Sequence, residues 1–182
     1  MQKLLIFSLG FSMILGLGLI SMNFSEKENN SVEVKTTTSQ AKMLNIGDKA
    51  PDFEGPTPEG KMLSLEEVKG KYTLVEFWAA WCRPCRVENP KLVKVYEKYH
   101  DQGFNIIGVS LDRNKNSWQK AIEKDGLTWS HVSNLKFWQD PIARKYNVRF
   151  VPMNYLIDEE GVIVARNLRS ASLERKLKEL LE

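Results

Sequence analysis

Two cysteines separated by two residues, Cys82 and Cys85, are the only cysteines in the 182-residue chain. The apolar run 72–79 before them predicts a buried strand, and the segment 86–100 after them predicts a helix. If the helix begins at or just before Cys82, free backbone N–H groups and the helix dipole stabilise its thiolate, the reactive form of cysteine. Cys82 is therefore the expected nucleophile toward a partner's disulfide, and Cys85, one turn later, is expected to resolve the mixed disulfide.

The two residues between the cysteines suit this chemistry. Pro84 fits a first helical turn, where proline loses no hydrogen bond, and Arg83 adds positive charge beside the sulfurs. A zinc site would need a second pair of ligands, and the two histidines, His100 and His131, lack a suitable spacing. A purely structural disulfide in so short a loop would add little stability. The motif in this context therefore favours redox chemistry, with no metal.

Length and composition describe an ordinary globular domain with appendages. Hydrophobic residues make up 42% of the chain and charged residues 27%, which is typical of a soluble domain. The formal net charge is only +3, and no basic cluster interleaved with aromatic residues occurs, so nucleic acid is not an expected partner.

The N-terminal residues have the pattern of an export segment. Lys3 precedes an apolar run over 4–22, and a polar cluster follows at 23–30. No good small-residue cleavage site follows the run, so an uncleaved membrane anchor is favoured over the alternative, a cleaved signal peptide. Both alternatives place the rest of the chain outside the cytoplasm. The predicted organisation is a signal peptide or anchor over 1–24, a disordered linker over 25–44 and one domain over 45–182.

The domain is predicted to alternate strands and helices between Gly and Pro turns. The expected elements are a β-hairpin around Phe53 and 61–63, a capped helical turn at 64–68, strands at 72–79, 104–110 and 129–132, helices at 86–100, 117–124 and from Asp140, a hairpin of strands 153–157 and 162–166, and a last helix bearing Leu173 and Leu177. This order predicts an α/β fold with a mixed central β-sheet and helices on both faces. The CxxC motif then lies at the carboxyl end of a strand, where such sheets place their sites.

The segment 75–85, VEFWAAWCRPC, closely resembles the active-site segment of thioredoxins. Pro90 falls where thioredoxins carry a proline in this helix, and Val151-Pro152 resembles their cis-proline site. Short motifs within 47–71 and the segment 115–132 are similar to those of the TlpA/ResA branch, as is an N-terminal anchor. The resemblance covers about 45–182 and implies a thioredoxin fold with an N-terminal β-hairpin extension.

The resemblance also implies how a partner binds. A cis peptide before Pro152 would place the backbone of Val151 beside the sulfurs, where it would pair with an extended partner strand; the alternative is an ordinary proline at a strand edge. Trp81 is expected to flank the thiols. Four further residues, His131, Trp118, Trp129 and Trp138, could line a partner groove, but core packing explains them more simply.

Two carboxylates are candidates for proton transfer. Glu76 occupies the place where many thioredoxins have a buried aspartate, and a buried carboxyl with a raised pKa would exchange a proton with Cys85 through water. The alternative is that this longer side chain reaches the surface. Glu88, three residues after Cys85, matches an acidic position near the site in some ResA-like proteins; the alternative is a solvated helix face.

The resemblance implies a thiol–disulfide oxidoreductase whose only redox group is the Cys82–Cys85 disulfide. Its branch acts outside the cytoplasm, on the periplasmic side of the cell envelope, and often reduces apocytochrome c during cytochrome c maturation. A membrane electron-donor protein re-reduces such proteins. The direction of transfer depends on the relative stability of thiolate and disulfide, which Arg83 would shift somewhat toward an oxidant.

Two other functions use the same residues. A copper-binding assembly protein would hold Cu(I) with both thiols and His131, the one plausible third ligand in the domain. A peroxidase shares the fold, but it would place a reactive cysteine in a different, single-cysteine loop.

Overall fold

The computed structural model describes residues 43–182. The predicted export segment over 1–24 and nearly all of the predicted linker over 25–44 lie outside the described residues. Among residues 43–182, no helix has both the length and the apolarity that a membrane crossing requires.

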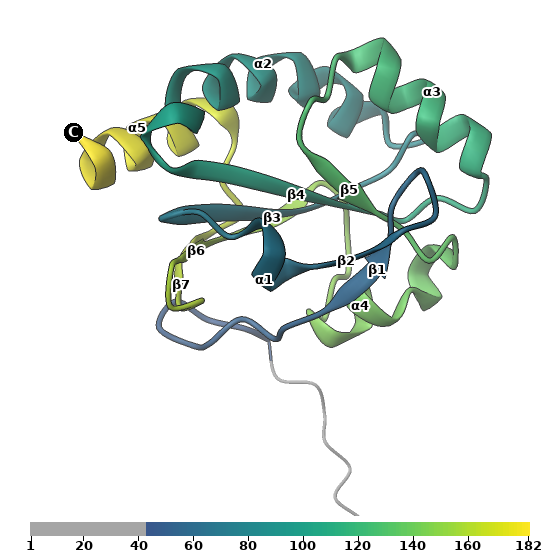
Figure 1. Cartoon of the computed structure of the whole chain (residues 1–182), viewed down its shortest axis with the longest axis horizontal. Helices are drawn as coiled ribbons and strands as arrows, with labels where there is room; N and C mark the ends of the chain where they lie inside the picture. The colour runs from purple at the N-terminus through teal and green to yellow at the C-terminus, as the bar shows by residue number, and fades with distance from the viewer. Residues whose placement is uncertain (1–42) are drawn as a thin grey trace, which may run out of the picture. The chain divides into compact units, whose positions relative to one another are not determined.

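A five-stranded mixed sheet forms the centre of the domain, in the order β5-β4-β3-β6-β7 (Figure 1). The strands are β3 (Tyr72–Trp78), β4 (Phe104–Ser110), β5 (Ser130–Val132), β6 (Met153–Asp158) and β7 (Ile163–Arg166). The first three are parallel, because helical crossovers join them, and β6 and β7 run antiparallel through a tight hairpin. The central β3 leads directly into the CxxC motif. The predicted mixed sheet is confirmed.

Helices cover both faces of this sheet. Figure 1 shows α2 (Arg83–Tyr99), α3 (Lys115–Asp125) and α5 (Ser170–Leu181) above the sheet, and α1 (Leu65–Val68), α4 (Pro141–Lys145) and the hairpin of β1 (Glu54–Pro56) with β2 (Met62–Ser64) below it. Two 3-10 turns complete the elements, η1 (His100–Gln102) and η2 (Phe137–Gln139). The β1–β2 hairpin confirms the predicted N-terminal extension.

Side-chain caps set the ends of these helices. Ser64 and Glu67 form the predicted capping box of α1. The predicted helix at 117–124 starts two residues earlier, at Lys115, because the side chain of Asn114 accepts a hydrogen bond from the backbone N–H of Ser117 (2.9 Å). Gly126 ends α3 at a φ of 68°, a left-handed value that glycine adopts without strain.

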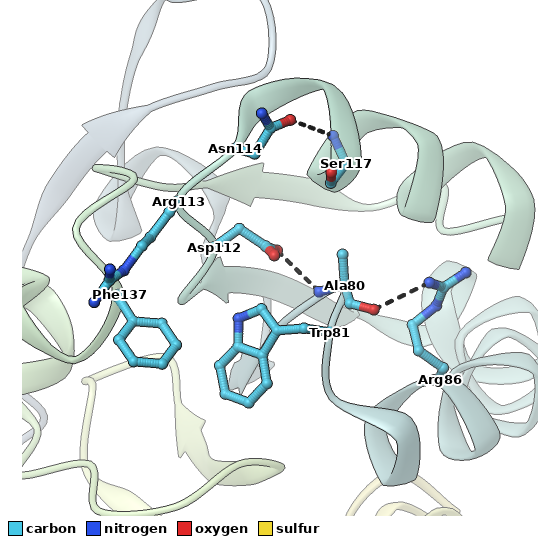
Figure 2. Close-up of a pocket in the computed structure, with 8 residues that line it drawn as sticks. All are labelled: Ala80, Trp81, Arg86, Asp112, Arg113, Asn114, Ser117 and Phe137. Atoms are coloured by element: carbon cyan, nitrogen blue, oxygen red, sulfur yellow. Dashed lines mark hydrogen bonds between the residues drawn. The ribbon is translucent and has the colours of Figure 1, made fainter.

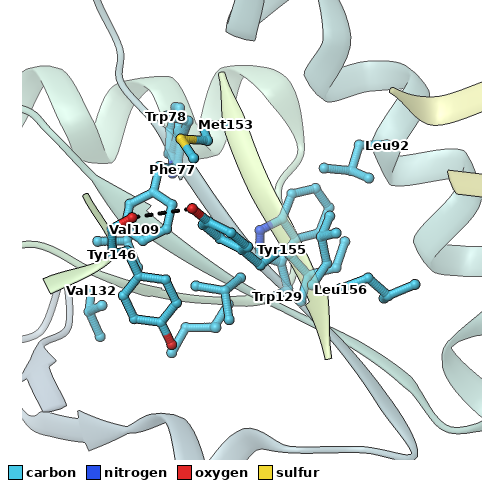
Figure 3. Packing of buried hydrophobic residues seen from close by; sticks show 14 of the residues in the cluster. Phe77, Trp78, Leu92, Val109, Trp129, Val132, Tyr146, Met153, Tyr155 and Leu156 are labelled. Carbon is cyan, nitrogen blue, oxygen red and sulfur yellow. Dashed lines mark hydrogen bonds between the residues drawn. The ribbon is translucent and has the colours of Figure 1, made fainter. Parts of the chain in front are cut away.

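The core is rich in aromatic side chains and continues across the sheet (Figure 3). Tyr146 packs against Phe77 and Tyr155, with ring centroids 5.2 and 5.6 Å apart. The hydroxyl of Tyr155 donates to the carbonyl of Tyr146 (3.2 Å), so the phenol is satisfied inside the core. This packing fixes β6 against the segment that leads to Pro152.

Core packing was the expected role of four polar or aromatic residues, and it holds for three. Trp118, Trp129 and His131 are buried, with 1%, 5% and 4% of their surface exposed. Trp138 is 37% exposed, so the core assignment is wrong for this residue. It lies on η2, a turn outside the sheet, where sequence periodicity gives no information on burial.

Candidate active site

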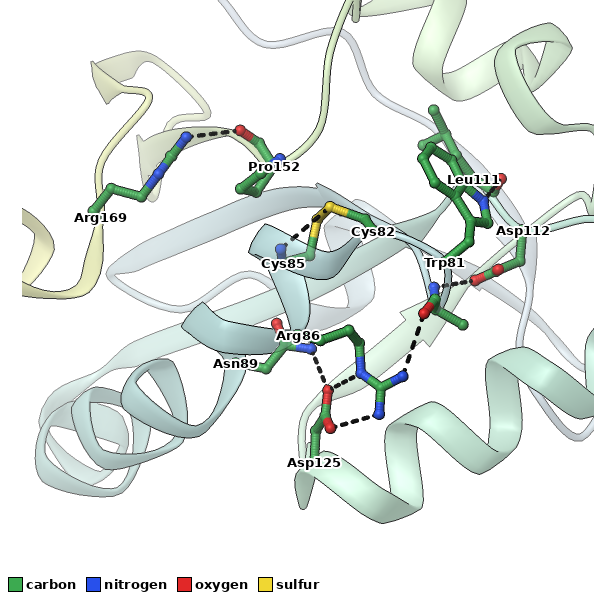
Figure 4. Close-up of a disulfide and its surroundings, with 11 residues drawn as sticks. Trp81, Cys82, Cys85, Arg86, Asn89, Leu111, Asp112, Asp125, Pro152 and Arg169 are labelled. Atoms are coloured by element: carbon green, nitrogen blue, oxygen red, sulfur yellow. Dashed lines mark hydrogen bonds and ion pairs between the residues drawn. A yellow bond between two sulfur atoms is a disulfide. The ribbon is translucent and has the colours of Figure 1, made fainter.

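Cys82 and Cys85 form a disulfide at the start of α2 (Figure 4). Cys82 is the N-cap residue, and its Sγ accepts a hydrogen bond from the backbone N–H of Cys85 (3.2 Å). In the reduced protein the same N–H would stabilise a Cys82 thiolate, together with the dipole of α2. Both cysteines are buried, but Cys85 has no exposed surface whereas Cys82 keeps 3%, so Cys82 is the more accessible of the two.

The residues around the two sulfurs lie as the motif predicts. Arg83 and Pro84 are the first two residues of α2, and both are exposed. The helix then continues through Pro90 to Tyr99. The positive charge of Arg83 therefore lies at the solvent side of the helix start, where a partner would approach.

The peptide bond between Val151 and Pro152 is cis, as predicted. Figure 4 shows Pro152 facing the disulfide across a short gap, although it lies on the segment before β6. Its carbonyl accepts a hydrogen bond from Nη2 of Arg169 (3.0 Å). The cis bond joins Pro152 directly to Val151, whose backbone is the group expected to pair with a partner strand.

Glu76 lies in the middle of β3 with only 3% of its surface exposed. The alternative that its side chain reaches the surface is therefore wrong. Burial, and secondarily the charge of Glu88, raises its pKa to about 8, while Arg169 acts in the opposite direction. The pKa of this carboxyl is close to the ordinary pKa of a thiol, so proton exchange with a cysteine needs little free energy.

The carboxylate of Glu88 caps another helix. Its Oε1 accepts hydrogen bonds from the backbone N–H and the hydroxyl of Ser170, both at 2.6 Å, at the first residue of α5. Burial acts to raise its pKa, but the hydrogen bonds from Ser170 and the charge of Lys91 hold that pKa below its ordinary value. Neither sequence-based interpretation included this contact. Through its charge, Glu88 also raises the pKa of Glu76.

Trp81 forms one side of the site and is 47% exposed. Its indole Nε1 donates to the carbonyl of Leu111 (3.2 Å), and its ring contacts Phe137 and Trp138 on η2, with centroids 5.2 and 6.1 Å away. The predicted flanking position of Trp81 agrees with this geometry. The two aromatic partners on η2 were not predicted.

A carboxylate and an ion pair, neither of them predicted from the sequence, hold the segment before Cys82. Asp112, buried at 2% exposure, accepts from the backbone N–H of Ala80 (2.9 Å), and Arg86 donates to the carbonyl of Ala80 (3.3 Å) (Figure 2). Arg86 is fixed by a two-pronged ion pair with Asp125, in which Nη2 lies 2.7 Å from Oδ1. Both backbone groups of Ala80 are therefore bonded, which makes the entry to the motif rigid.

The position of Asp112 held a usable signal, but that of Asp125 did not. Asp112 lies two residues after the end of β4, at the carboxyl edge of the sheet, where ligating and catalytic groups gather. Asp125 lies 39 residues after Arg86, at the far end of α3, so no local pattern connects the two.

His131 is buried on β5 between two tryptophans. Its ring centroid lies 5.5 Å from that of Trp78 and 5.8 Å from that of Trp129, and neither ring nitrogen has a hydrogen-bond partner. Burial lowers its pKa to about 3. Among residues 43–182, no group of three His, Cys, Asp or Glu side chains is placed to hold a metal ion, so the copper alternative gains no support.

The fold and the site together define a class of protein. A CxxC disulfide at the N-terminus of a helix, after the central strand of a mixed sheet and opposite a cis-proline, is the arrangement of a thioredoxin-fold thiol–disulfide oxidoreductase.

Comparisons with known proteins identify the family. The family model described as AhpC/TSA matches residues 46–166, and the chain belongs to this thioredoxin-like family. The thiol-disulfide oxidoreductase ResA of Geobacillus kaustophilus is 33% identical over 138 residues, which cover 74% of this chain and 78% of the relative. The thioredoxin-like protein YneN of Bacillus subtilis is 35% identical over 66% of this chain and 69% of its own length.

Solved structures agree with this assignment. The thioredoxin domain of a thiol-disulfide oxidoreductase from Bacteroides vulgatus is 40% identical, with a TM-score of 0.71, over 76% of this chain and 99% of that domain. A thiol-disulfide oxidoreductase from Bacteroides fragilis is 35% identical, with a TM-score of 0.68, over 74% of this chain and all of that one (100%). The protein is a TlpA/ResA-like thiol–disulfide oxidoreductase.

Proposed function

We propose that the protein reduces disulfides in exported proteins, on the periplasmic side of the cell envelope, and that apocytochrome c is among its substrates. The observation on which this rests is the pair of sulfurs at the start of α2, with Cys82 3% exposed and Cys85 fully buried. The similarity to ResA supports the assignment to disulfide exchange. A membrane protein that donates electrons would return the disulfide to the dithiol.

In the proposed reaction, two electrons pass from the dithiol to the partner. The thiolate of Cys82 attacks one sulfur of the partner's disulfide, forms a mixed disulfide and releases the partner's other sulfur as a thiolate. Cys85 then loses its proton and attacks Cys82, which closes the Cys82–Cys85 disulfide and releases the second partner thiolate.

Glu76 is the proposed proton carrier for Cys85. Its ionised form accepts the Cys85 proton when the dithiol reacts. In the oxidised protein its pKa of about 8 keeps the carboxyl mainly protonated at neutral pH. When a reducing partner opens the disulfide, Glu76 returns this proton to the departing Cys85 thiolate.

The export segment completes the proposal. We propose that residues 1–24 anchor the chain in the membrane, with residues 25–44 as a linker and the domain outside the cytoplasm. The apolar run after Lys3 supports this location. A chain found only in the soluble fraction of the envelope, without its first 20 or so residues, would favour the cleaved signal peptide instead.

The two cysteine variants test the mechanism. We expect Cys82→Ser to abolish insulin reduction by the full chain, and Cys85→Ser to accumulate a mixed disulfide that a non-reducing gel separates. Partners trapped in cells by Cys85→Ser, identified by mass spectrometry, test the substrate class. Full insulin-reductase activity in the Cys82 variant would exclude this mechanism, and trapped partners confined to the cytoplasm would exclude the location.

A further inference from the structure

A row of three aromatic side chains, two of them exposed, begins next to the disulfide. It consists of Trp81, Phe137 and Trp138, which we call the aromatic ridge. Phe137 contacts both tryptophans, with ring centroids 5.2 Å from Trp81 and 5.6 Å from Trp138. Trp81 and Trp138 are 47% and 37% exposed. Large apolar groups that gather at a reaction centre and remain exposed are typical of a binding surface.

The segment that presents the ridge is held in an unusual conformation. Leu135 and Phe137 have φ values of 57° and 55°, a left-handed region that such side chains rarely adopt. The fully buried Asp140 stabilises this turn, because its carboxylate accepts from the backbone N–H of Asn134 (3.1 Å) and of Ile142 (2.8 Å). The two η2 aromatics are therefore set in place outside the core before a partner arrives.

A hollow lies on each side of the ridge, and arginines border both. The first, of about 420 Å³, is lined by Trp81, Phe137, Arg86 and Arg113 (Figure 2). The guanidinium of Arg113 lies 4.5 Å from the ring centroid of Phe137. The second, of about 620 Å³, is lined by Trp138, Arg144, Asn147, Val148 and Arg149. Arg149 is two residues before Val151, so this hollow adjoins the backbone expected to pair with a partner.

The accessible charges on this surface have one sign. Between residues 133 and 152 the sequence has Lys136, Arg144, Lys145 and Arg149 against a single carboxylate, Asp140, which is buried. Five exposed cations border the ridge and the motif, and within residues 43–182 none of them forms an ion pair: Arg83, Arg113, Lys136, Arg144 and Arg149.

The nearby acids do not offset these cations. Asp112 is buried beneath Ala80, and Asp125 is paired with Arg86. A partner that docks here therefore meets apolar rings between unpaired positive charges. Favourable docking requires the opposite charge on the partner.

We propose that this surface selects partners whose disulfide is flanked by acidic residues, in an extended segment with carboxylates on both sides of an apolar residue. The proposal rests on the proposed function, since the partner's cysteine must reach Cys82. The segment pairs with the backbone of Val151, its apolar residue packs on the aromatic ridge, and its carboxylates bind Arg113 on one side and Arg144 and Arg149 on the other. Guanidinium groups match carboxylates in geometry as well as charge.

Three synthetic peptides test the selection. They share one intramolecular disulfide and one adjacent leucine, and differ in having Glu, Gln or Lys on both sides. With the full chain reduced beforehand and held in detergent, we expect the second-order rate constant for reduction of the Glu peptide to exceed that for the Lys peptide by about tenfold at low salt, and this ratio to shrink as salt screens the charges. Equal values for the three peptides would overturn the proposal.

A charge-reversal variant places the effect on this surface. Arg144→Glu with Arg149→Glu should invert the preference, so that the Lys peptide reacts faster than the Glu peptide. Arg175→Glu, an exposed arginine on α5, changes the net charge in the same direction and should leave the preference in place. An equal loss of preference in the Arg175 variant would mean that net charge, not the surface, decides, and would also overturn the proposal.

Two further measurements separate other causes. Reduction of bis(2-hydroxyethyl) disulfide, a small neutral substrate, should be unchanged in all these variants. If the wild-type protein does not reduce this substrate, the proposed function is contradicted instead.

Phosphatidylglycerol vesicles should compete poorly with the Glu peptide. Vesicles that suppress Glu-peptide turnover, and no longer do so in the Arg144 and Arg149 variant, would assign the surface to anionic lipid and overturn the proposal.

Discussion

Gly108 and His131 are paired in register on β4 and β5, and a methyl group on Gly108 would lie 2.3 Å from Nδ1 of His131. The imidazole thus occupies the space that a side chain at position 108 would need. It is held there between Trp78 and Trp129 without a hydrogen bond to either ring nitrogen. The buried histidine on one strand therefore requires a glycine at the paired position of the next strand.

The first prediction concerns this contact. Gly108→Ala should lower the free energy of unfolding by about 1–3 kcal/mol, because the new methyl group displaces the ring of His131 and crowds Nε1 of Trp78, 3.0 Å away. Urea denaturation measures the change. In a His131→Ala background the same substitution should cost much less, since the space is free. An equal loss in both backgrounds would show that the clash with His131 is not the cause.

The second prediction is a loss of stability in mild acid. Burial lowers the pKa of His131 to about 3, whereas in the unfolded chain the imidazole takes up a proton near pH 6.5. The unfolded state therefore binds the proton first, and stability decreases as the pH falls below 6.5. Between pH 8 and pH 5 the free energy of unfolding of the wild-type protein should fall by about 2 kcal/mol more than that of His131→Phe, which keeps an aromatic ring in place. If denaturation gives the same change in unfolding free energy between pH 8 and pH 5 for both proteins, the prediction is wrong.

The third prediction has the opposite sign. Folded Glu76 keeps its proton up to about pH 8, whereas unfolded Glu releases it near pH 4.5, so its stabilising effect is complete below pH 4.5 and is lost as the pH rises through 8. Over this range the free energy of unfolding of the oxidised wild-type protein should fall by up to about 1.4 kcal/mol per pH unit relative to that of Glu76→Gln. Glu97→Gln, on the exposed side of α2, is the matched control and should retain the wild-type slope. A Glu76→Gln profile that follows the wild type would show that the carboxyl is not held neutral.

The fourth prediction concerns the contact that joins α2 to α3. The carboxylate of Asp125 binds the guanidinium of Arg86 and the amide of Asn89, whose Nδ2 lies 2.8 Å away. Asp125→Asn should lower the free energy of unfolding by about 2 kcal/mol, because it leaves a partly buried cation unpaired. Glu123→Gln removes an exposed charge from the same helix and should change stability little. Thermal denaturation that ranks the two variants equally would argue against the ion pair.

Most of the fold followed from local sequence patterns. Several elements agree with the structure to within a residue: the strands at 104–110 and 72–79, the capping box at Ser64, and the hairpin of strands 153–157 and 162–166. These elements have a strong periodicity or a defined turn, which acts within a few residues. The predicted start of α3 was late because Asn114, a polar residue outside the apolar pattern, caps the helix.

The predictions for the site agreed best where the residues are contiguous in sequence. Cys82 is the N-cap of α2, and the bond before Pro152 is cis. Glu88 influences Glu76 through its charge, but its carboxylate binds Ser170, 82 residues away. Sequence spacing could not identify that partner, because it depends on how α5 packs against α2.

The chemistry and the fold class were determined by the sequence itself, because a CxxC pair between a buried strand and a helix needs only neighbouring residues to be understood. Tertiary structure decided what surrounds the sulfurs. It placed Asp112 and Arg86 on the two backbone groups of Ala80, and it left the aromatic ridge exposed between unpaired arginines. Such contacts join segments far apart in the chain, and their energies depend on burial and distance, which exist only once the sheet and its helices have packed together.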